Sequence, residues 1–410
     1  MLPMRELAAD FIPTRHRRSE HIDVVLGQLS RVMPAIETPS DDRWQQIGLA
    51  LMEGDPAMDA LLTAMSRHGM RDARAQFERA LEHGIDAVAN PLPELRCFIE
   101  QMSTPPDWLD RTRIERGAEL FRRCGRAALH IGRNVALLGG YQASAFNRTL
   151  ILTGALQKGP TRRLAETVQW KLDCTVAGGL VPHAIGWRST LMVRFIHALV
   201  RRSVAARPDW QLEDWGLPIN QADMGATLYG SLTVPVVGSR LLGMLQTRRE
   251  RDDAAHLVRY VGWLIGVDER WLADTEAGAT AQLLQFLLSL SNPDETSVMM
   301  AQPLVDEPLT RRYPNLAWLR GRYERSKNLS ISRAFLGANA LRRLGVPAGT
   351  WPWYPLLAIP RNLARHTLSR VVPGGRRRAA ARGRAEQEAN VQQMVMQPAV
   401  AVGASLAAPH

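Results

Sequence analysis

Three polar side chains lie on one stripe of an otherwise apolar segment, STLMVRFIHALVRRSV, at residues 189–204. When this segment is projected as a helix, Arg194, His197 and Arg201 fall within about 60° of one another, and apolar residues fill nearly all other positions. A helix that is apolar almost all round is expected to be buried. Burying one imidazole and two guanidinium groups on a single stripe is costly unless a partner offsets their lost hydration.

Two kinds of partner would satisfy this stripe, and the residues alone leave both open. One is an anionic, metal-bearing group such as a haem, because neutral imidazole is a common axial ligand to the iron and arginines bind the propionate carboxylates. The other is purely structural: His197 is then a core histidine, and Arg194 and Arg201 pair with Asp or Glu of neighbouring helices.

A second stripe lies upstream in the segment TRRLAETVQWKLDC, at residues 161–174. Its basic, acidic, hydroxyl, indole and thiol groups share one helical face because of their spacing: Arg163, Glu166, Thr167, Trp170 and Cys174. The alternative is an exposed helix on which Arg163 pairs with Glu166 or Thr167, and such a surface pair contributes little to stability.

These two stripes carry a resemblance to a known family. Arg163 and Thr167, followed by His197 thirty residues after the threonine, resemble the latex-clearing protein (rubber oxygenase) family and its relative, the mycophenolate-pathway oxygenase of fungi. Two further segments match in order, GLPINQ at 216–221 and RYVGWLIGV at 259–267. The resemblance covers about two-fifths of the chain, from Trp108 to Asp274.

The resemblance implies a globin-like helical core with one non-covalent b-type haem. It assigns His197 as the axial ligand to the iron and places Arg163 and Thr167 close to the haem, with Arg194 and Arg201 as helix neighbours of the ligand. The characterised members cleave an isoprenoid double bond with dioxygen. We therefore expect an oxidoreductase of the oxygenase type that acts with dioxygen on an apolar small molecule or polymer.

Two positions depart from the rubber-cleaving members, so rubber itself is not the expected substrate. Glu166 stands where many of them carry a lysine able to cap the iron, and Asn147 stands where they carry a glutamate proposed as a base. We expect Arg163 and Thr167 to position the haem and the oxygen-side network, and Glu166 to handle protons.

Two other functions remain open from the sequence. The first is a non-catalytic helical protein that uses the same cavity to carry or sense haem or a lipid. The second is a non-haem iron site in which His183 and His197 join a carboxylate, either Glu166 or Asp173.

Helical periodicity runs along most of the chain, with apolar residues recurring every three or four positions and breaks at Gly and Pro. Because no strand pattern alternates with these helices, we predict an all-α fold with a globin-like core, additional N-terminal helices and a disordered C-terminal tail. The expected regions are an N-terminal helical part, an oxygenase core, an apolar segment rich in Pro and Trp, and a disordered basic tail: 1–103, 104–345, 346–372 and 373–410.

Composition restricts the choice of partners and location. Much of the formal charge of +11 comes from arginines at 370–384, and no aromatic-interleaved basic pattern accompanies the scattered others, so nucleic-acid binding is not expected. No apolar run reaches the roughly 18–20 residues of a spanning helix, and the N-terminus lacks the features of a secretory signal. We predict a cytoplasmic protein with peripheral membrane contact through its C-terminal segment and no obligate protein partner.

Overall fold

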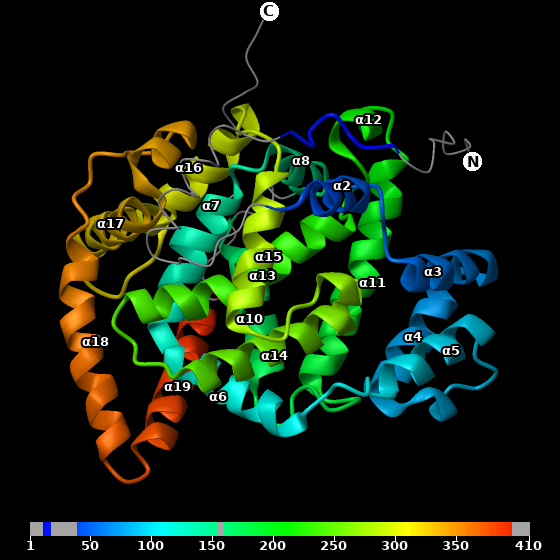
Figure 1. The fold of residues 1–410 in the computed structure, drawn as a ribbon, viewed down its shortest axis with the longest axis horizontal. Coiled ribbons are helices and arrows are strands. Elements are labelled where there is room, and N and C mark those ends of the chain that lie inside the picture. The colour runs from blue at the N-terminus through cyan, green and yellow to red at the C-terminus, as the bar shows by residue number, and fades with distance from the viewer. Residues whose placement is uncertain (1–10, 18–38, 155–159, 396–410) are drawn as a thin grey trace, which may run out of the picture.

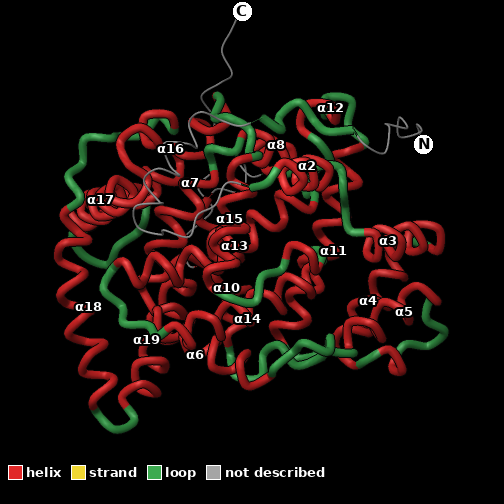
Figure 2. Tube along the Cα trace, viewed as in Figure 1, coloured by secondary structure: helices red, strands yellow, loops and turns green. Residues whose placement is uncertain are grey.

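A computed structural model describes residues 11–17, 39–154 and 160–395 of the chain. Within these ranges the structure consists of helices joined by loops and contains no strand (Figure 2). The prediction of an all-α fold with additional N-terminal helices is therefore confirmed.

Of the N-terminal helices, α3, α4 and α5 form a group at one side of the molecule, whereas α2 packs on α13 and α15 of the core (Figure 1). Asp55 caps α3 by accepting a hydrogen bond from the backbone NH of Met58, and Pro56 occupies its first turn, where no amide hydrogen is needed. Residues 18–38 of the predicted N-terminal helical part, 1–103, lie outside the described residues. The N-terminal helices are α2 (Asp41–Ala50), α3 (Pro56–His68), α4 (Met70–His83), η1 (Ile85–Ala87) and α5 (Pro93–Ser103).

The core is built around α13, which packs against α6 and α14 (Figure 1). Helix α6 runs directly into a π-helical segment, η2, a rare local geometry that often lies at functional sites. The elements of this region are α6 (Arg111–Ile131), η2 (Gly132–Leu137), α7 (Leu138–Gly140), α8 (Ser144–Leu152), α10 (Pro160–Thr175), α11 (Ile185–Ala205), α12 (Leu212–Trp215), α13 (Gln221–Leu241), α14 (Arg248–Ile265), η3 (Glu269–Trp271), α15 (Glu276–Leu288), α16 (Glu295–Thr310) and α17 (Ala317–Arg343).

Helix α11 is held in the core by contacts that include α4 and α10. Its Trp187, Leu191 and Phe195 are fully buried, and the Phe195 ring packs 5.0 Å from the ring of Phe77 in α4. Gly186 allows α10 to approach closely, because a Cβ there would collide with the backbone of α10 at its C-terminal end. The predicted burial of the apolar 189–204 segment is thus largely observed, although Ile196 is 46% exposed.

The apolar segment rich in Pro and Trp, at 346–372, is largely helical. Residues Trp353–Val371 form α18, with Pro360 inside the helix. Pro355 lies in the first turn, where proline is tolerated, and Tyr354, Ala358 and Asn362 bury one face against the core.

The prediction that the chain is disordered from 373 onward is wrong for residues Gly375–Val395, which form α19. The Ala- and Arg-rich sequence has high helix propensity, and Gly383 brings α19 against the backbone of α6 at Arg122. Gln387 adds a hydrogen bond of 3.2 Å to the carbonyl of Phe121. The Arg- and Ala-rich composition suggested disorder, but contacts with α6 order residues 375–395. Residues 396–410 lie outside the described part.

No helix in the described ranges combines the length and the apolar character needed to cross a bilayer. The three cysteines are free thiols: Cys124 and Cys174 are buried, and Cys97 is exposed.

Candidate functional site

The two arginines of the α11 stripe have carboxylate partners within the protein. Arg194 binds Asp55 in a bidentate manner, with distances of 2.6 Å from Nε and 2.7 Å from one terminal nitrogen, and both side chains are buried. Arg201 reaches Asp59 at 3.1 Å. This is the structural arrangement that the sequence left open, and a haem propionate at either arginine would have to share or displace a carboxylate.

The motifs that carry the resemblance hold this arrangement in place. The Gln221 amide donates to the carbonyls of Gly54 and Gly266, at 2.7 and 3.0 Å, and so joins the turn before α3 to the end of α14. Gly266 adopts a left-handed conformation with φ of 93°, and a Cβ there would collide with Asp55 and Arg194. The two motifs therefore position the buried ion pair rather than contribute reactive groups.

His197 differs from its arginine neighbours because no described residue forms a hydrogen bond with its ring. Its Nδ1 is buried without a partner, and the side chain is only partly buried overall. Burial lowers the pKa of His197 to about 4, and the nearby Arg201 contributes in the same direction. The imidazole is therefore neutral at physiological pH, with a lone pair free to bind a metal.

Helices α10 and α11 run antiparallel, and their contacts fix the register. Cys174 lies against Gly186 and Thr190, and Trp170 Nε1 donates a hydrogen bond of 3.0 Å to the Thr190 hydroxyl. Both helices advance about 1.5 Å per residue. Continued along both helices, this register brings Arg163 to the same level as His197.

The periodicity of each helix agrees with this alignment. Gly186, Thr190 and His197 share one face of α11, because they are spaced by four and then seven residues. Arg163 and Trp170 share the corresponding face of α10. His197 therefore lies on the side of α11 that faces α10, although no hydrogen bond or ion pair joins it to Arg163.

The three predicted residues of α10 are placed differently from one another. Arg163 is partly buried near Tyr141, and burial lowers the pKa of its guanidinium. Glu166 and Thr167 are both exposed. Glu166 pairs with Arg162 at 3.2 Å on the surface, and not with Arg163.

Lys171 is the interior cation of α10 that the sequence analysis missed. Its Nζ lies about 4.0 Å from the position that a Cβ on Gly132 would occupy, at the start of the π-helical segment η2. Burial alone lowers the pKa of Lys171 to about 8, and no described carboxylate pairs with it. The signal was available, because Lys171 follows Thr167 by one helical turn and Arg163 by two.

His183 and Asp173, the other residues of the non-haem iron alternative, contact neighbouring protein groups. His183 Nδ1 lies 3.1 Å from the Leu81 carbonyl, and its ring packs on Trp187. Asp173 accepts a hydrogen bond from Gln169 at 2.7 Å. Among the described residues no three His, Cys, Asp or Glu side chains gather as a metal site, so the proposed non-haem iron triad is not assembled.

Asn147 is fully buried, and its amide nitrogen donates to the Tyr141 carbonyl at 2.7 Å, while its Oδ1 has no partner among the described residues. Tyr141 in turn lies close to Arg163. Asn147 therefore helps to position Tyr141, which lies close to Arg163. An amide at position 147 cannot serve as a base.

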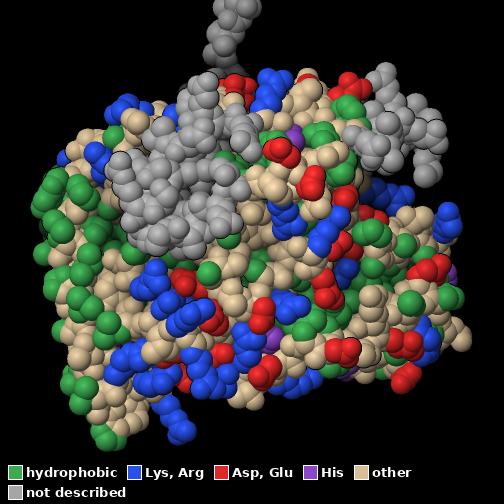
Figure 3. All heavy atoms as spheres, viewed as in Figure 1, with side chains coloured by type: hydrophobic (Ala, Val, Ile, Leu, Met, Phe, Trp, Pro, Cys, Tyr) green, Lys and Arg blue, Asp and Glu red, His purple; other side chains and the backbone are tan. Residues whose placement is uncertain are grey.

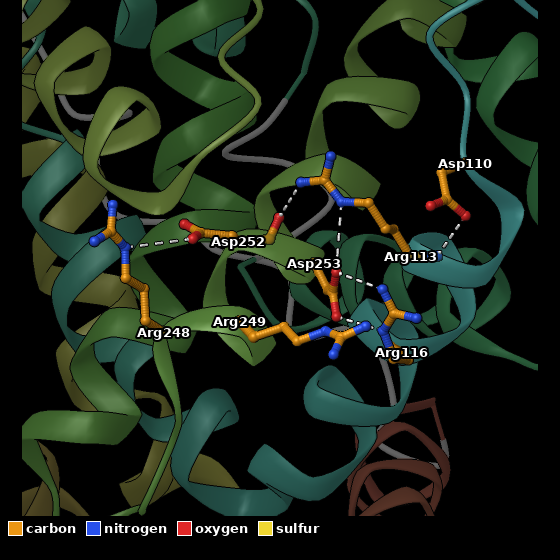
Figure 4. Close-up of a pocket in the computed structure, with 7 residues that line it drawn as sticks. All are labelled: Asp110, Arg113, Arg116, Arg248, Arg249, Asp252 and Asp253. Carbon is orange, nitrogen blue, oxygen red and sulfur yellow. Dashed lines mark hydrogen bonds and ion pairs between the residues drawn. The ribbon is translucent and has the colours of Figure 1, made fainter.

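A hollow of about 520 Å³ lies away from these groups, between the start of α6 and the start of α14 (Figure 4). Only charged residues line it: Asp110, Arg113, Arg116, Arg248, Arg249, Asp252 and Asp253. Asp253 binds Arg116 at 2.6 Å and Arg113 at 3.4 Å, so the carboxylate joins two arginines of α6 to α14. This ionic hollow lacks the apolar lining expected for an apolar substrate.

Comparison with known proteins extends the resemblance beyond the motifs. Residues 128–367 match the family model described as "ER-bound oxygenase mpaB/B'/Rubber oxygenase, catalytic domain". The match starts later than the motifs suggested and continues into α18, and it includes both stripes. The chain is 24% identical over 236 residues to the rubber oxygenase of Streptomyces sp. (strain K30), which covers 57% of this chain and 54% of that protein. The chain therefore spans about half the length of this relative.

The fold is also similar to a solved structure, that of latex clearing protein LCP in the closed state. The TM-score is 0.58, with 17% sequence identity, and the similarity covers 85% of this chain and 91% of that one. At this identity the comparison shows a shared fold.

Proposed function

Because the chain belongs to the ER-bound oxygenase mpaB/B'/rubber oxygenase catalytic-domain family, we propose that it is a haem-b-dependent oxygenase. It acts with dioxygen on an apolar substrate of isoprenoid or lipid-like character. The observation that carries this proposal is His197, a neutral imidazole on the family's motif whose ring has no hydrogen-bond partner among the described residues.

The surroundings of His197 fit a haem. The buried Nδ1 of His197 without a partner costs about 1–3 kcal/mol, and ligation of iron would offset this cost where Nδ1 is the nitrogen that binds. Val193 and Val200, one turn before and one turn after His197 on α11, are partly buried apolar neighbours of the kind that a macrocycle packs against. When bound, the haem would supply the iron centre at which dioxygen is activated.

Two cations of α10 are better candidates for the propionates than the arginines of α11. Arg194 and Arg201 already bind Asp55 and Asp59. Arg163 and Lys171 have no ion pair with a described carboxylate, and both are partly buried. Arg163 and Lys171 therefore hold the propionates in this proposal, while Arg194 and Arg201 keep the ligand helix in position.

The proton-handling role predicted for Glu166 is not kept in this proposal, because Glu166 is exposed and paired with Arg162. Lys171, which points toward η2 and has a pKa of about 8, is assigned to the propionates and not also to acid–base chemistry. Arg163 is likewise assigned to the propionates, so Thr167 remains the proposed oxygen-side residue.

An optical spectrum of the purified protein tests the proposal. After expression with added haem precursor, a Soret band and a b-type pyridine haemochrome are expected, and dioxygen should be consumed when an isoprenoid or unsaturated lipid is added. Absence of the Soret band would refute the proposal. Haem without oxygen consumption on any such substrate would favour the carrier or sensor alternative. A cytoplasmic location with peripheral membrane contact also remains part of the proposal.

A further inference from the structure

Helix α18 exposes a continuous apolar face to solvent. Five side chains on one side of the helix form this surface, which we call the α18 face: Leu356 (54% exposed), Leu357 (64%), Leu363 (39%), Leu368 (64%) and Val371 (76%). Their spacing places them on one side of the helix, opposite the residues that α18 buries against the core. Figure 3 shows hydrophobic side chains gathered along this edge of the molecule, where α18 runs in Figure 1.

The first half of α17 extends this surface with aromatic residues. Trp318 is 72% exposed, and Leu319 and Tyr323 are also exposed. The Tyr323 ring packs 5.7 Å from the ring of Trp353 at the start of α18, so the two helices form one surface. Tryptophan and tyrosine beside leucine are typical of protein surfaces that sit at a membrane–water interface.

The segment that forms this surface is rich in arginine, although acidic residues from outside it bind some of these arginines, as Asp306 binds Arg325 and Glu386 binds Arg365. Residues 309–385 contain 17 Arg and Lys and a single acidic residue, Glu324, which pairs with Lys327 at 2.6 Å. Arg320, Arg322 and Arg361 are exposed, and none of them pairs with a carboxylate among the described residues. In contrast, the arginines that the sequence suggested as a basic tail are partly used inside the fold, since Arg376 binds Glu250 at 2.8 Å.

We propose that the α18 face and the exposed start of α17 bind peripherally to an anionic lipid bilayer. The apolar side chains enter the interface, and the arginines beside them meet the lipid phosphates. A second copy of the chain is a poorer occupant, because pairing this surface with itself would bring two arginine-rich rims together. The surface lies apart from His197, so binding to lipid does not depend on haem.

Vesicle flotation tests this proposal directly. The full-length protein is mixed with vesicles of phosphatidylcholine or with vesicles of equal parts phosphatidylcholine and phosphatidylglycerol. We expect flotation with the anionic vesicles, and a decrease as added salt shortens the Debye length. The double variant Leu357→Asn/Leu368→Asn should lower the vesicle partition coefficient about tenfold or more, because two leucines no longer enter the interface.

The matched control is Val181→Asn/Ile185→Asn, which changes two exposed apolar residues outside this surface, at 45% and 48% exposure. It should float like the unchanged protein. Equal flotation of both double variants, or no flotation of the unchanged protein with anionic vesicles, would overturn the proposal. So would a dimer in light scattering that Leu357→Asn/Leu368→Asn converts to monomer, since the face would then be an interface between copies.

Discussion

The polar side chains at the two edges of the α11 stripe have opposite surroundings. Toward α3, Arg194 and Arg201 each bind a carboxylate, so the charge that the helix buries is neutralised within the protein. Toward α10, His197 has no hydrogen-bond or ion-pair partner among the described residues, and neither has Lys171 of α10 itself; burial lowers the pKa of both groups. The first side is complete as it stands, whereas the second has groups available for a ligand. Substitutions on the two sides should therefore change stability in opposite directions.

The largest effect is expected at Asp55. Asp55→Ala leaves the Arg194 guanidinium buried without its carboxylate and removes the cap of α3, so the free energy of unfolding should fall by about 3–5 kcal/mol in urea titrations. Asp86→Ala is the control, because Asp86 is 95% exposed and its pair with Arg96 contributes little. If Asp55→Ala lowered the free energy of unfolding by less than about 1 kcal/mol, the Asp55–Arg194 pair would not have the structural role assigned to it.

The variant Lys171→Met should change the free energy of unfolding in the opposite direction. The haem-free variant should be more stable by about 1–2 kcal/mol at neutral pH, because the native state no longer holds an unpaired, partly buried ammonium group. The native pKa of about 8 lies below the ordinary 10.5, so this gain should be present below pH 8 and disappear as pH rises toward 10.5. Haem affinity in a Soret titration should decrease in the same variant. Destabilisation of the haem-free protein would show that Lys171 already has a partner.

Acid should act on the α10 side through His197. Because its native pKa of about 4 lies below the 6.5 of the unfolded chain, the unfolded state binds more protons between these values. The free energy of unfolding should therefore fall as pH drops from 6.5 to 4. The fall should be shallower in His197→Leu but not abolished, because burial also lowers the pKa values of His16 and His366 to about 4 and lowers those of His130 and His256. Identical pH profiles for the two proteins would contradict this account of His197.

The smallest effect is expected on the surface of α10. Arg162→Gln should change the free energy of unfolding by no more than about 0.5 kcal/mol, because Arg162 and Glu166 form an exposed pair with side chains 70% and 63% accessible. Haem affinity should be unchanged. A large loss of haem affinity in this variant would show that Glu166 belongs to the haem site after all.

The sequence predicted the helices better than it predicted which side chains contact one another. The apolar periodicity around His197 predicted a buried helix, because local periodicity reports which side of a helix is buried. The nearness of Arg163 to the proposed haem was an implication of the family resemblance and stays a prediction. The carboxylate that binds Arg194 lies 139 residues away along the chain, and no local pattern could identify it. For the same reason, the contacts of Gly383 and Gln387 with α6 were not foreseen, and Arg- and Ala-rich composition wrongly suggested disorder for α19.

The central claim is that His197 binds the haem, and a cavity variant tests it most directly. His197→Gly removes the imidazole from α11, while His183→Gly removes a histidine that packs on Trp187 in a structural role. Titration of each purified, haem-free protein with haem should give a Soret band for His183→Gly and a weak, shifted one for His197→Gly. Free imidazole should then restore the native spectrum of His197→Gly. A native spectrum for His197→Gly without imidazole would contradict the account.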